Sequence, residues 1–208
     1  MTLPLRFAIV ATASALALAA CSQEAEAPAT NDVTVGDEMS ADTAMSNDAT
    51  AGGNAMAGAG QRFNFTGGDG SALGSVTVSE GAGGATMQLA ASGMPAGVHG
   101  IHLHEKGVCE GPKFESAGAH WNPGAKQHGR DNPQGPHLGD LANFEVSGDG
   151  SASTSFTAAG VAMASGETML ADADGTSIVV HAKADDYRTD PSGNSGDRIA
   201  CAVIAPPK

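Results

Sequence analysis

The sequence has 208 residues, enough for one ordinary domain and some additional chain. Its formal net charge of −13 argues against a nucleic acid as a partner, because a phosphate backbone repels an acidic protein. Glycine accounts for 29 residues and aromatic residues for only 4%, a composition that favours short strands and tight turns over helices.

The first 20 residues have the pattern of an export signal. A single basic residue, Arg6, precedes an apolar run that begins at Phe7 and is too short to span a bilayer, so residues 1–20 are predicted to be a signal peptide. The run ends in "LAAC", which resembles the bacterial lipobox. Cys21 is therefore predicted to be lipidated and to anchor the protein to a membrane of the cell envelope, in the periplasm or at the outer surface. An ordinary signal peptide followed by an incidental cysteine is the alternative.

Residues 21–60 are predicted to be a disordered tether that begins with the lipidated Cys21. The segment is rich in Ala, Gly and acidic residues, contains no Lys or Arg, and lacks the apolar spacing needed to bury a face. The folded domain is accordingly predicted to span residues 61–208.

Alternating apolar and polar residues recur from residue 61 onward. In "GSVTVSEG", for example, Val76 and Val78 share one face and hydroxyl side chains the other. Strand-like segments are predicted at 61–65, 74–81, 85–93, 142–150, 151–160, 176–182 and 198–204. Short strands separated by turn signals favour an all-β antiparallel sandwich or barrel. Two longer segments, about 107–140 and 182–197, break this pattern and are predicted to be functional loops.

Three of the seven histidines lie within the stretch "HGIHLHEKG". Residues two apart in a strand face the same way, so His102 and His104 can share one ion, whereas His99 is expected to face the other side and to have a hydrogen-bonded structural role. His120 in the first loop and His181 at a strand end complete a set of four imidazoles. An all-nitrogen set of this kind favours Cu²⁺.

A second candidate set lies within the first loop. It comprises His120, His128, His137 and Asp140, of which the last two belong to the turn sequence "HLGD". Three imidazoles and one carboxylate make a closed four-coordinate set suited to a structural Zn²⁺, which would pin the loop.

Five motifs together resemble the copper–zinc superoxide dismutases in their bacterial branch. They are "HGIHLHE", "SAGAHWNP", "HLGDL", "VVHAKADD" and "GDRIAC", and they follow the family's order across residues 61–208. The resemblance implies an eight-stranded antiparallel Greek-key β-sandwich or barrel, immunoglobulin-like, with two long functional loops. It also implies an enzyme that converts two superoxide anions and two protons into O₂ and hydrogen peroxide by Cu(II)/Cu(I) cycling, with one copper and one zinc ion per subunit.

The same resemblance assigns roles to individual residues. Copper would be held by His102, His104, His120 and His181. Zinc would be held by His120, His128, His137 and Asp140, so that His120 bridges the two ions. Asp185 matches an aspartate that hydrogen-bonds one ligand of each metal, here His102 and His128. Arg198 matches an arginine beside the copper and, with His120, would take part in catalysis.

The cysteines fit this family too. Cys109 and Cys201 match its disulfide, which an exported compartment permits. The third cysteine, Cys21, is then the one used for lipidation.

Other interpretations of the site stay open. A non-catalytic copper-binding or copper-delivering lipoprotein on the same fold is the main alternative, although His120 as a bridge and Arg198 favour the enzyme. A cupin-like site would need a glutamate at a fixed spacing after "HLH", and a blue-copper carrier would need a free Cys ligand, which the disulfide would consume. The expected partners are superoxide and, through the lipid on Cys21 only, a membrane. A homodimer is one arrangement that the sequence leaves open.

Overall fold

The computed structural model describes residues 60–208. The expected signal peptide (1–20), the expected lipidation site at Cys21 and all of the expected tether except Gly60 lie outside the described residues. Within the described part of the chain, no helix is long and apolar enough to cross a membrane.

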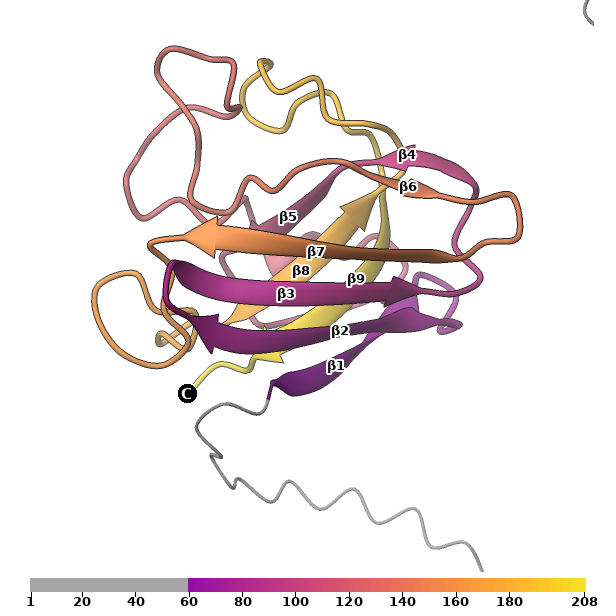
Figure 1. Cartoon of the computed structure of the whole chain (residues 1–208), viewed down its shortest axis with the longest axis horizontal. Helices are drawn as coiled ribbons and strands as arrows, with labels where there is room; N and C mark the ends of the chain where they lie inside the picture. The colour runs from indigo at the N-terminus through magenta and orange to yellow at the C-terminus, as the bar shows by residue number, and fades with distance from the viewer. Residues whose placement is uncertain (1–59) are drawn as a thin grey trace, which may run out of the picture. The chain divides into compact units, whose positions relative to one another are not determined.

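Nine β-strands and one 3₁₀ turn make up the regular structure of residues 60–208 (Figure 1). The strands are β1 (Gln61–Gly67), β2 (Ala72–Gly81), β3 (Gly84–Ala91), β4 (Gly97–His99), β5 (Ile101–His104), β6 (Phe144–Val146), β7 (Ala152–Ala159), β8 (Thr176–His181) and β9 (Arg198–Ala205). The 3₁₀ turn, η1, spans Glu115–Ala117. The all-β fold class predicted from the sequence is confirmed.

Seven strands form one antiparallel sheet in the order β5-β8-β9-β1-β2-β3-β7, and β4 pairs separately with β6. The chain leaves β3, forms β4 to β6, and returns with β7 beside β3, while β8 pairs with β5 at the other end of the sheet. These crossing connections are those of a Greek key.

The strand count differs from the eight that the resemblance implies, because Gly100 separates β4 from β5. Its N–H donates to Lys183 O, and its carbonyl accepts from His181 N, so its backbone bonds go to the second long loop and to the end of β8. As a result, β4 pairs with β6 whereas β5 pairs with β8.

Period-two alternation explains the strands that cover the core. Val76 and Val78 on β2 lie opposite Leu89 and Met87 on β3, and all four side chains are buried. β8 differs, because each of its six residues is buried. It lies between β5 and β9 and contributes to two apolar clusters. Its residues therefore do not alternate between buried and exposed positions.

The first long loop returns to the outer edge of β5 twice, once in its middle and once at its end. Leu103 N donates to Gly139 O at 2.9 Å, and Trp121 N donates to Leu103 O at 2.8 Å. The approach is close at Gly139, where a Cβ would lie 2.6 Å from Leu103 O, so glycine is required there. Figure 1 shows the first and second long loops at the same end of the sheet.

A disulfide joins the start of the first loop to β9. Cys109 and Cys201 are bonded, with their Cα atoms 5.8 Å apart and 92 positions of sequence between them, which confirms the predicted pair. Closing a loop of this length stabilises the folded chain by about 4–5 kcal/mol in the chain-entropy model. The bond lies beside the smaller apolar cluster, in which Phe114, Ala117 and Val179 are buried.

We expect Leu103→Ala to lower the free energy of unfolding by about 2–5 kcal/mol, because the Leu103 side chain is fully buried in the main core and its removal leaves a cavity. Gln88→Ala, at an exposed position of β3, is the control and should stay within about 0.5 kcal/mol of the unsubstituted protein. Urea unfolding measures both. Equal losses in the two variants would contradict the packing described here.

Candidate metal centre

Four histidines converge at the edge of the sheet nearest the two loops. His102 and His104 come from β5, His181 ends β8, and His120 is brought beside His104 by an isolated β-bridge. One ring nitrogen from each of these residues lies within 4.8 Å of the others, and all four residues are buried. Strand periodicity, the pairing of β5 with β8, and the return of the first loop together produce this cluster.

One nitrogen of each ring is hydrogen-bonded within the protein. His104 Nδ1 donates to Gly118 O at 3.0 Å, and His181 Nδ1 donates to Gly196 O at 3.3 Å. The remaining nitrogens of the cluster are buried and have no hydrogen-bond partner among residues 60–208: His102 Nδ1, His104 Nε2, His120 Nε2 and His181 Nε2. A buried polar atom without a partner is costly, and one bound cation would satisfy all four. This donor set fits Cu²⁺.

A second group surrounds one carboxylate oxygen. Asp140 Oδ1 lies 3.1 Å from His120 Nδ1, 3.0 Å from His128 Nδ1 and 3.1 Å from His137 Nδ1. In a tetrahedral zinc site with metal–ligand bonds near 2.0 Å, neighbouring ligand atoms are about 3.3 Å apart. The residues present therefore fit a zinc ion. The other oxygen of Asp140 accepts hydrogen bonds from Gly129 N and His137 N, which orients the carboxylate.

The two groups share the ring of His120. Its Nε2 belongs to the all-histidine cluster, and its Nδ1 faces Asp140. Asp185 connects the groups a second time. Its two carboxylate oxygens accept hydrogen bonds from His102 Nε2 and from His128 Nε2, each at 2.9 Å, in a position that is only 3% exposed. Such hydrogen bonds fix the orientation of rings that bind metals.

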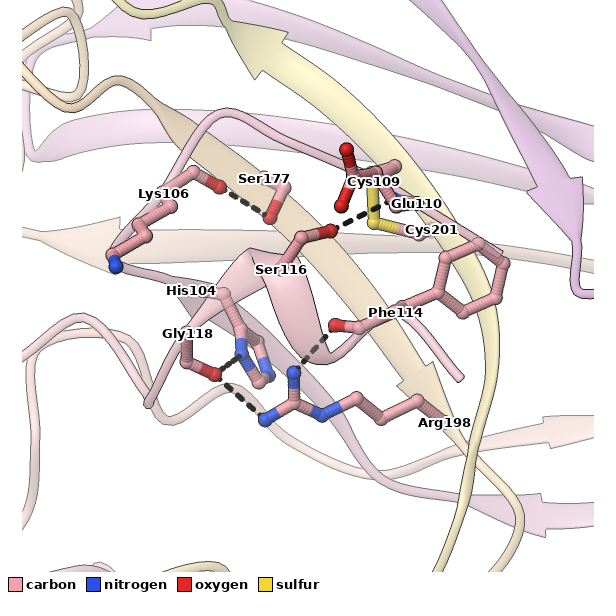
Figure 2. The surroundings of a disulfide bond; sticks show 10 residues. All are labelled: His104, Lys106, Cys109, Glu110, Phe114, Ser116, Gly118, Ser177, Arg198 and Cys201. Carbon is pink, nitrogen blue, oxygen red and sulfur yellow. Dashed lines mark hydrogen bonds between the residues drawn. A yellow bond between two sulfur atoms is a disulfide. The ribbon is translucent and has the colours of Figure 1, made fainter. Parts of the chain in front are cut away.

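Arg198 begins β9 directly opposite His181 in the strand register. Its Nη1 donates to Phe114 O and its Nη2 donates to Gly118 O, both at 2.6 Å. Gly118 O is also the acceptor for His104, so one carbonyl joins the arginine to the histidine cluster (Figure 2). The guanidinium borders an open cleft of about 600 Å³, which is also lined by one other basic residue, Lys113, and by two acidic residues, Glu115 and Asp197.

Burial controls the charge of the all-histidine cluster. Loss of hydration lowers the pKa of His120 to about 4, although the hydrogen bond to Asp140 partly opposes this effect. Loss of hydration, together with the nearby His102, lowers the pKa of His181 to about 3. These rings are neutral at physiological pH, and a neutral ring nitrogen can bind a metal.

The group around Asp140 behaves differently. Burial disfavours a charged His128, but hydrogen bonds to Asp140 and Asp185 outweigh it and raise the pKa of His128 to about 9. Burial likewise opposes ionisation of Asp140, yet hydrogen bonds from the three imidazoles hold the pKa of its carboxyl well below the usual range. Without a metal, this group is an ion pair at neutral pH.

The structure brings together every side chain that the sequence analysis named as a ligand, and it places Asp185 and Arg198 beside them. His99 stays apart, as expected: it is buried, and its ring nitrogens lie 2.8 Å from His181 O and 2.9 Å from Pro95 O.

Two residues that hold Asp185 were not anticipated. Asn143 pairs with the Asp185 backbone, and Tyr187 N donates to Asp185 Oδ1. One sequence feature could have drawn attention to Tyr187: it is the only tyrosine of the chain, and it lies in a polar loop.

The fold and the two adjoining groups define an all-β protein with a pair of candidate metal sites that share one histidine. The family model for copper/zinc superoxide dismutase (SODC) matches residues 72–204. The chain belongs to this family.

Individual relatives agree with this assignment. A copper–zinc superoxide dismutase of Caulobacter vibrioides is 45% identical over 140 residues, which cover 66% of this chain and 80% of the relative. A superoxide dismutase-like protein of Bacillus subtilis has a solved structure that matches with a TM-score of 0.67 at 37% identity, over 70% of this chain and 99% of the other. The copper/zinc superoxide dismutase of Brucella abortus matches with a TM-score of 0.56 at 28% identity, over 70% and 99% of the two chains.

We expect zinc affinity to rise with pH. Below about pH 9, metal-free His128 carries a proton that zinc must displace, so the affinity should increase about tenfold per pH unit between pH 6 and 8. Copper affinity should change much less over this range, because His120 and His181, with pKa values of about 4 and 3, are already neutral. Chelator-competition titrations at three pH values, with one metal at a time, provide the measurement, because a second ion on His120 would also displace its remaining N–H proton. Zinc and copper affinities with the same pH slope would refute this difference between the sites.

Proposed function

We propose that the protein is a superoxide dismutase of the cell envelope, which converts two superoxide anions and two protons into O₂ and hydrogen peroxide. The observation that carries the proposal is the set of four unpartnered imidazole nitrogens that converge beside Arg198. Membership of the copper/zinc superoxide dismutase family supports the same activity.

The proposed metal ligands are the residues of the two side-chain groups described above. Copper would be held by His102, His104, His120 and His181, and zinc by His120, His128, His137 and Asp140. Copper supplies the one-electron oxidation and reduction when bound, which zinc, with its filled d shell, does not.

The protein's own side chains position the substrate and supply a proton. The guanidinium of Arg198 is held by two carbonyl oxygens, and its other N–H groups are left to bind an anion in the cleft. His120 Nε2, when it is not bound to copper, is the buried ring atom that would hold a proton and pass it to the reduced substrate. Asp185 keeps the rings of His102 and His128 in place meanwhile.

The envelope location is proposed from the start of the sequence. Residues 1–20 would direct export, and Cys21 would carry the lipid through which the protein meets a membrane. The disulfide between Cys109 and Cys201 supports an oxidising compartment.

A non-catalytic copper-binding protein on the same fold is the second candidate. It is favoured by the similarity to a Bacillus subtilis relative, 40% identical over 139 residues, that is named only as superoxide dismutase-like. Metal analysis of the purified protein together with a superoxide-consumption assay separates the two. Protein that binds copper and zinc without consuming superoxide would support the second candidate.

We expect Arg198→Glu to reduce the second-order rate of dismutation at least about tenfold with both metals retained, because it replaces the cation in the cleft by an anion. Focusing of an electric field by a charged cleft raises association rates, an effect of which superoxide dismutases are an established example. The control is Arg62→Glu, which changes the net charge equally at an exposed position of β1. Equal losses in both variants would show that overall charge, not Arg198, governs the encounter.

The rate of the unsubstituted protein should fall as ionic strength rises, despite the net charge of −13. Charges more than about 8 Å apart in physiological salt are largely screened, so the nearby Arg198 outweighs distant acids. Stopped-flow kinetics at increasing salt measure this dependence. A rate that climbs with salt would mean that global repulsion dominates.

We expect Cys21 to be the lipidated N-terminus of the mature protein, because "LAAC" ends the apolar run. Mass spectrometry of protein taken from membranes tests this, with Cys21→Ser as the comparison, which should leave the protein unlipidated. An unmodified Cys21 or cleavage at another site would disprove it.

A further inference from the structure

Tyr187 in the second long loop contacts both loops and the group between the metal sites. Its N–H donates to Asp185 Oδ1 at 2.6 Å, and its carbonyl accepts from Asp131 N at 3.0 Å. Its hydroxyl oxygen accepts from Asn143 N at 2.7 Å. The guanidinium carbon of Arg130 lies 3.7 Å from the centre of its ring.

The backbone of Tyr187 adopts a left-handed conformation, with φ of 61°. A non-glycine residue rarely adopts this conformation, which persists where the surrounding contacts over-determine it. Here the contacts come from Asp131 and Arg130 in the first loop and from Asn143, which immediately precedes β6. The ring is therefore held by segments that are distant in the sequence.

Asn143 completes the arrangement around Asp185. Its side-chain amide donates to Asp185 O and accepts from Asp185 N, both at 2.9 Å. Because the Asn143 backbone N–H also binds the Tyr187 hydroxyl, one residue fixes both the Asp185 backbone and the far end of the tyrosine ring. The Asp185 carboxylate is thereby aimed at His102 and His128.

We propose that Tyr187 is a positioning residue that, clamped by Arg130 and Asn143, holds the Asp185 carboxylate between His102 and His128. It acts through Asp185, and the side-chain contacts that carry the proposal are those with Asn143 N and Arg130. The proposal deepens the proposed function and rests on it, because it concerns retention of the zinc that His128 would bind. It also gives a structural role to the contact between the Arg130 guanidinium and the Tyr187 ring. This contact joins the two long loops.

The first test is the rate at which zinc leaves the fully metal-loaded protein for an excess of a chromogenic chelator. Tyr187→Gly removes the ring and accepts the left-handed backbone without strain, and a second glycine substitution in the same loop controls for the added backbone freedom. We expect zinc release to be at least about tenfold faster in Tyr187→Gly and about threefold faster in Arg130→Gln, which removes only the cation over the ring.

Matched controls are available in the same loop. Asn194→Gly replaces another left-handed residue, with φ of 51°, whose side chain bonds only to Asp186 and Thr189 among the described residues. Arg188→Gln removes an exposed guanidinium without touching the Tyr187 ring. Both should release zinc within about twofold of the unsubstituted protein. Arg130→Gln keeps the test decisive if Tyr187→Gly fails to fold.

The second test separates positioning from general loosening of the fold. In the reduced, metal-loaded protein, which is diamagnetic, NMR follows solvent exchange of three imidazole N–H protons. Those of His102 and His128, donated to Asp185, should exchange several-fold faster in Tyr187→Gly, whereas that of His104, donated to Gly118 O, should not change. Equal acceleration at all three would overturn the proposal.

Neither test uses superoxide. Unchanged zinc release in both Tyr187→Gly and Arg130→Gln would overturn the role of Tyr187 alone. Metal-loaded protein that consumes no superoxide would contradict the proposed activity alone, so the two failures are distinguishable.

Discussion

The candidate metal centre depends on two hydrogen bonds of one residue in the middle of β5. The N–H of Leu103 binds Gly139 O, and its carbonyl accepts from Trp121 N, so the middle and the end of the first long loop both extend the sheet beyond its last strand. His120 precedes one of these attachment points and Asp140 follows the other, which places them beside His104 and His102. The edge of the sheet thus fixes the backbone at these two residues.

Residue patterns within one segment predicted the features that depend on that segment alone. Strand alternation located the buried faces and placed His102 and His104 on one side of a strand, but His128, His137 and Asp140 could be grouped only by composition and by resemblance to a known family. The break at Gly100 and the clamp on Asp185 were not predicted. Both depend on partners far along the chain: Lys183 for Gly100, and Asn143 for Asp185, 42 positions away. The spacing of apolar and polar residues within one segment carries no information about such long-range contacts.

The net charge of the protein does not describe the charges close to the candidate metal sites. The sequence is strongly acidic, yet the cation of Arg198 is held by the carbonyl oxygens of Phe114 and Gly118, the second of which also accepts from His104. Within the site, burial keeps the rings of His120 and His181 neutral, while Asp140 and Asp185 keep His128 charged in the absence of metal. Neighbouring imidazoles thus differ in charge because their hydrogen-bond partners differ.

The disulfide has a consequence beyond stability. Cys109 holds the segment that leads to Phe114 and Gly118, the two residues whose carbonyl oxygens orient Arg198, and Cys201 lies three positions after that arginine in β9 (Figure 2). A chain retained where thiols stay reduced would keep every candidate metal-ligand side chain but lose the covalent bond between the two segments that position Arg198. If the protein is exported as proposed, oxidation of the two thiols to this disulfide would couple the positioning of Arg198 to arrival in an oxidising compartment.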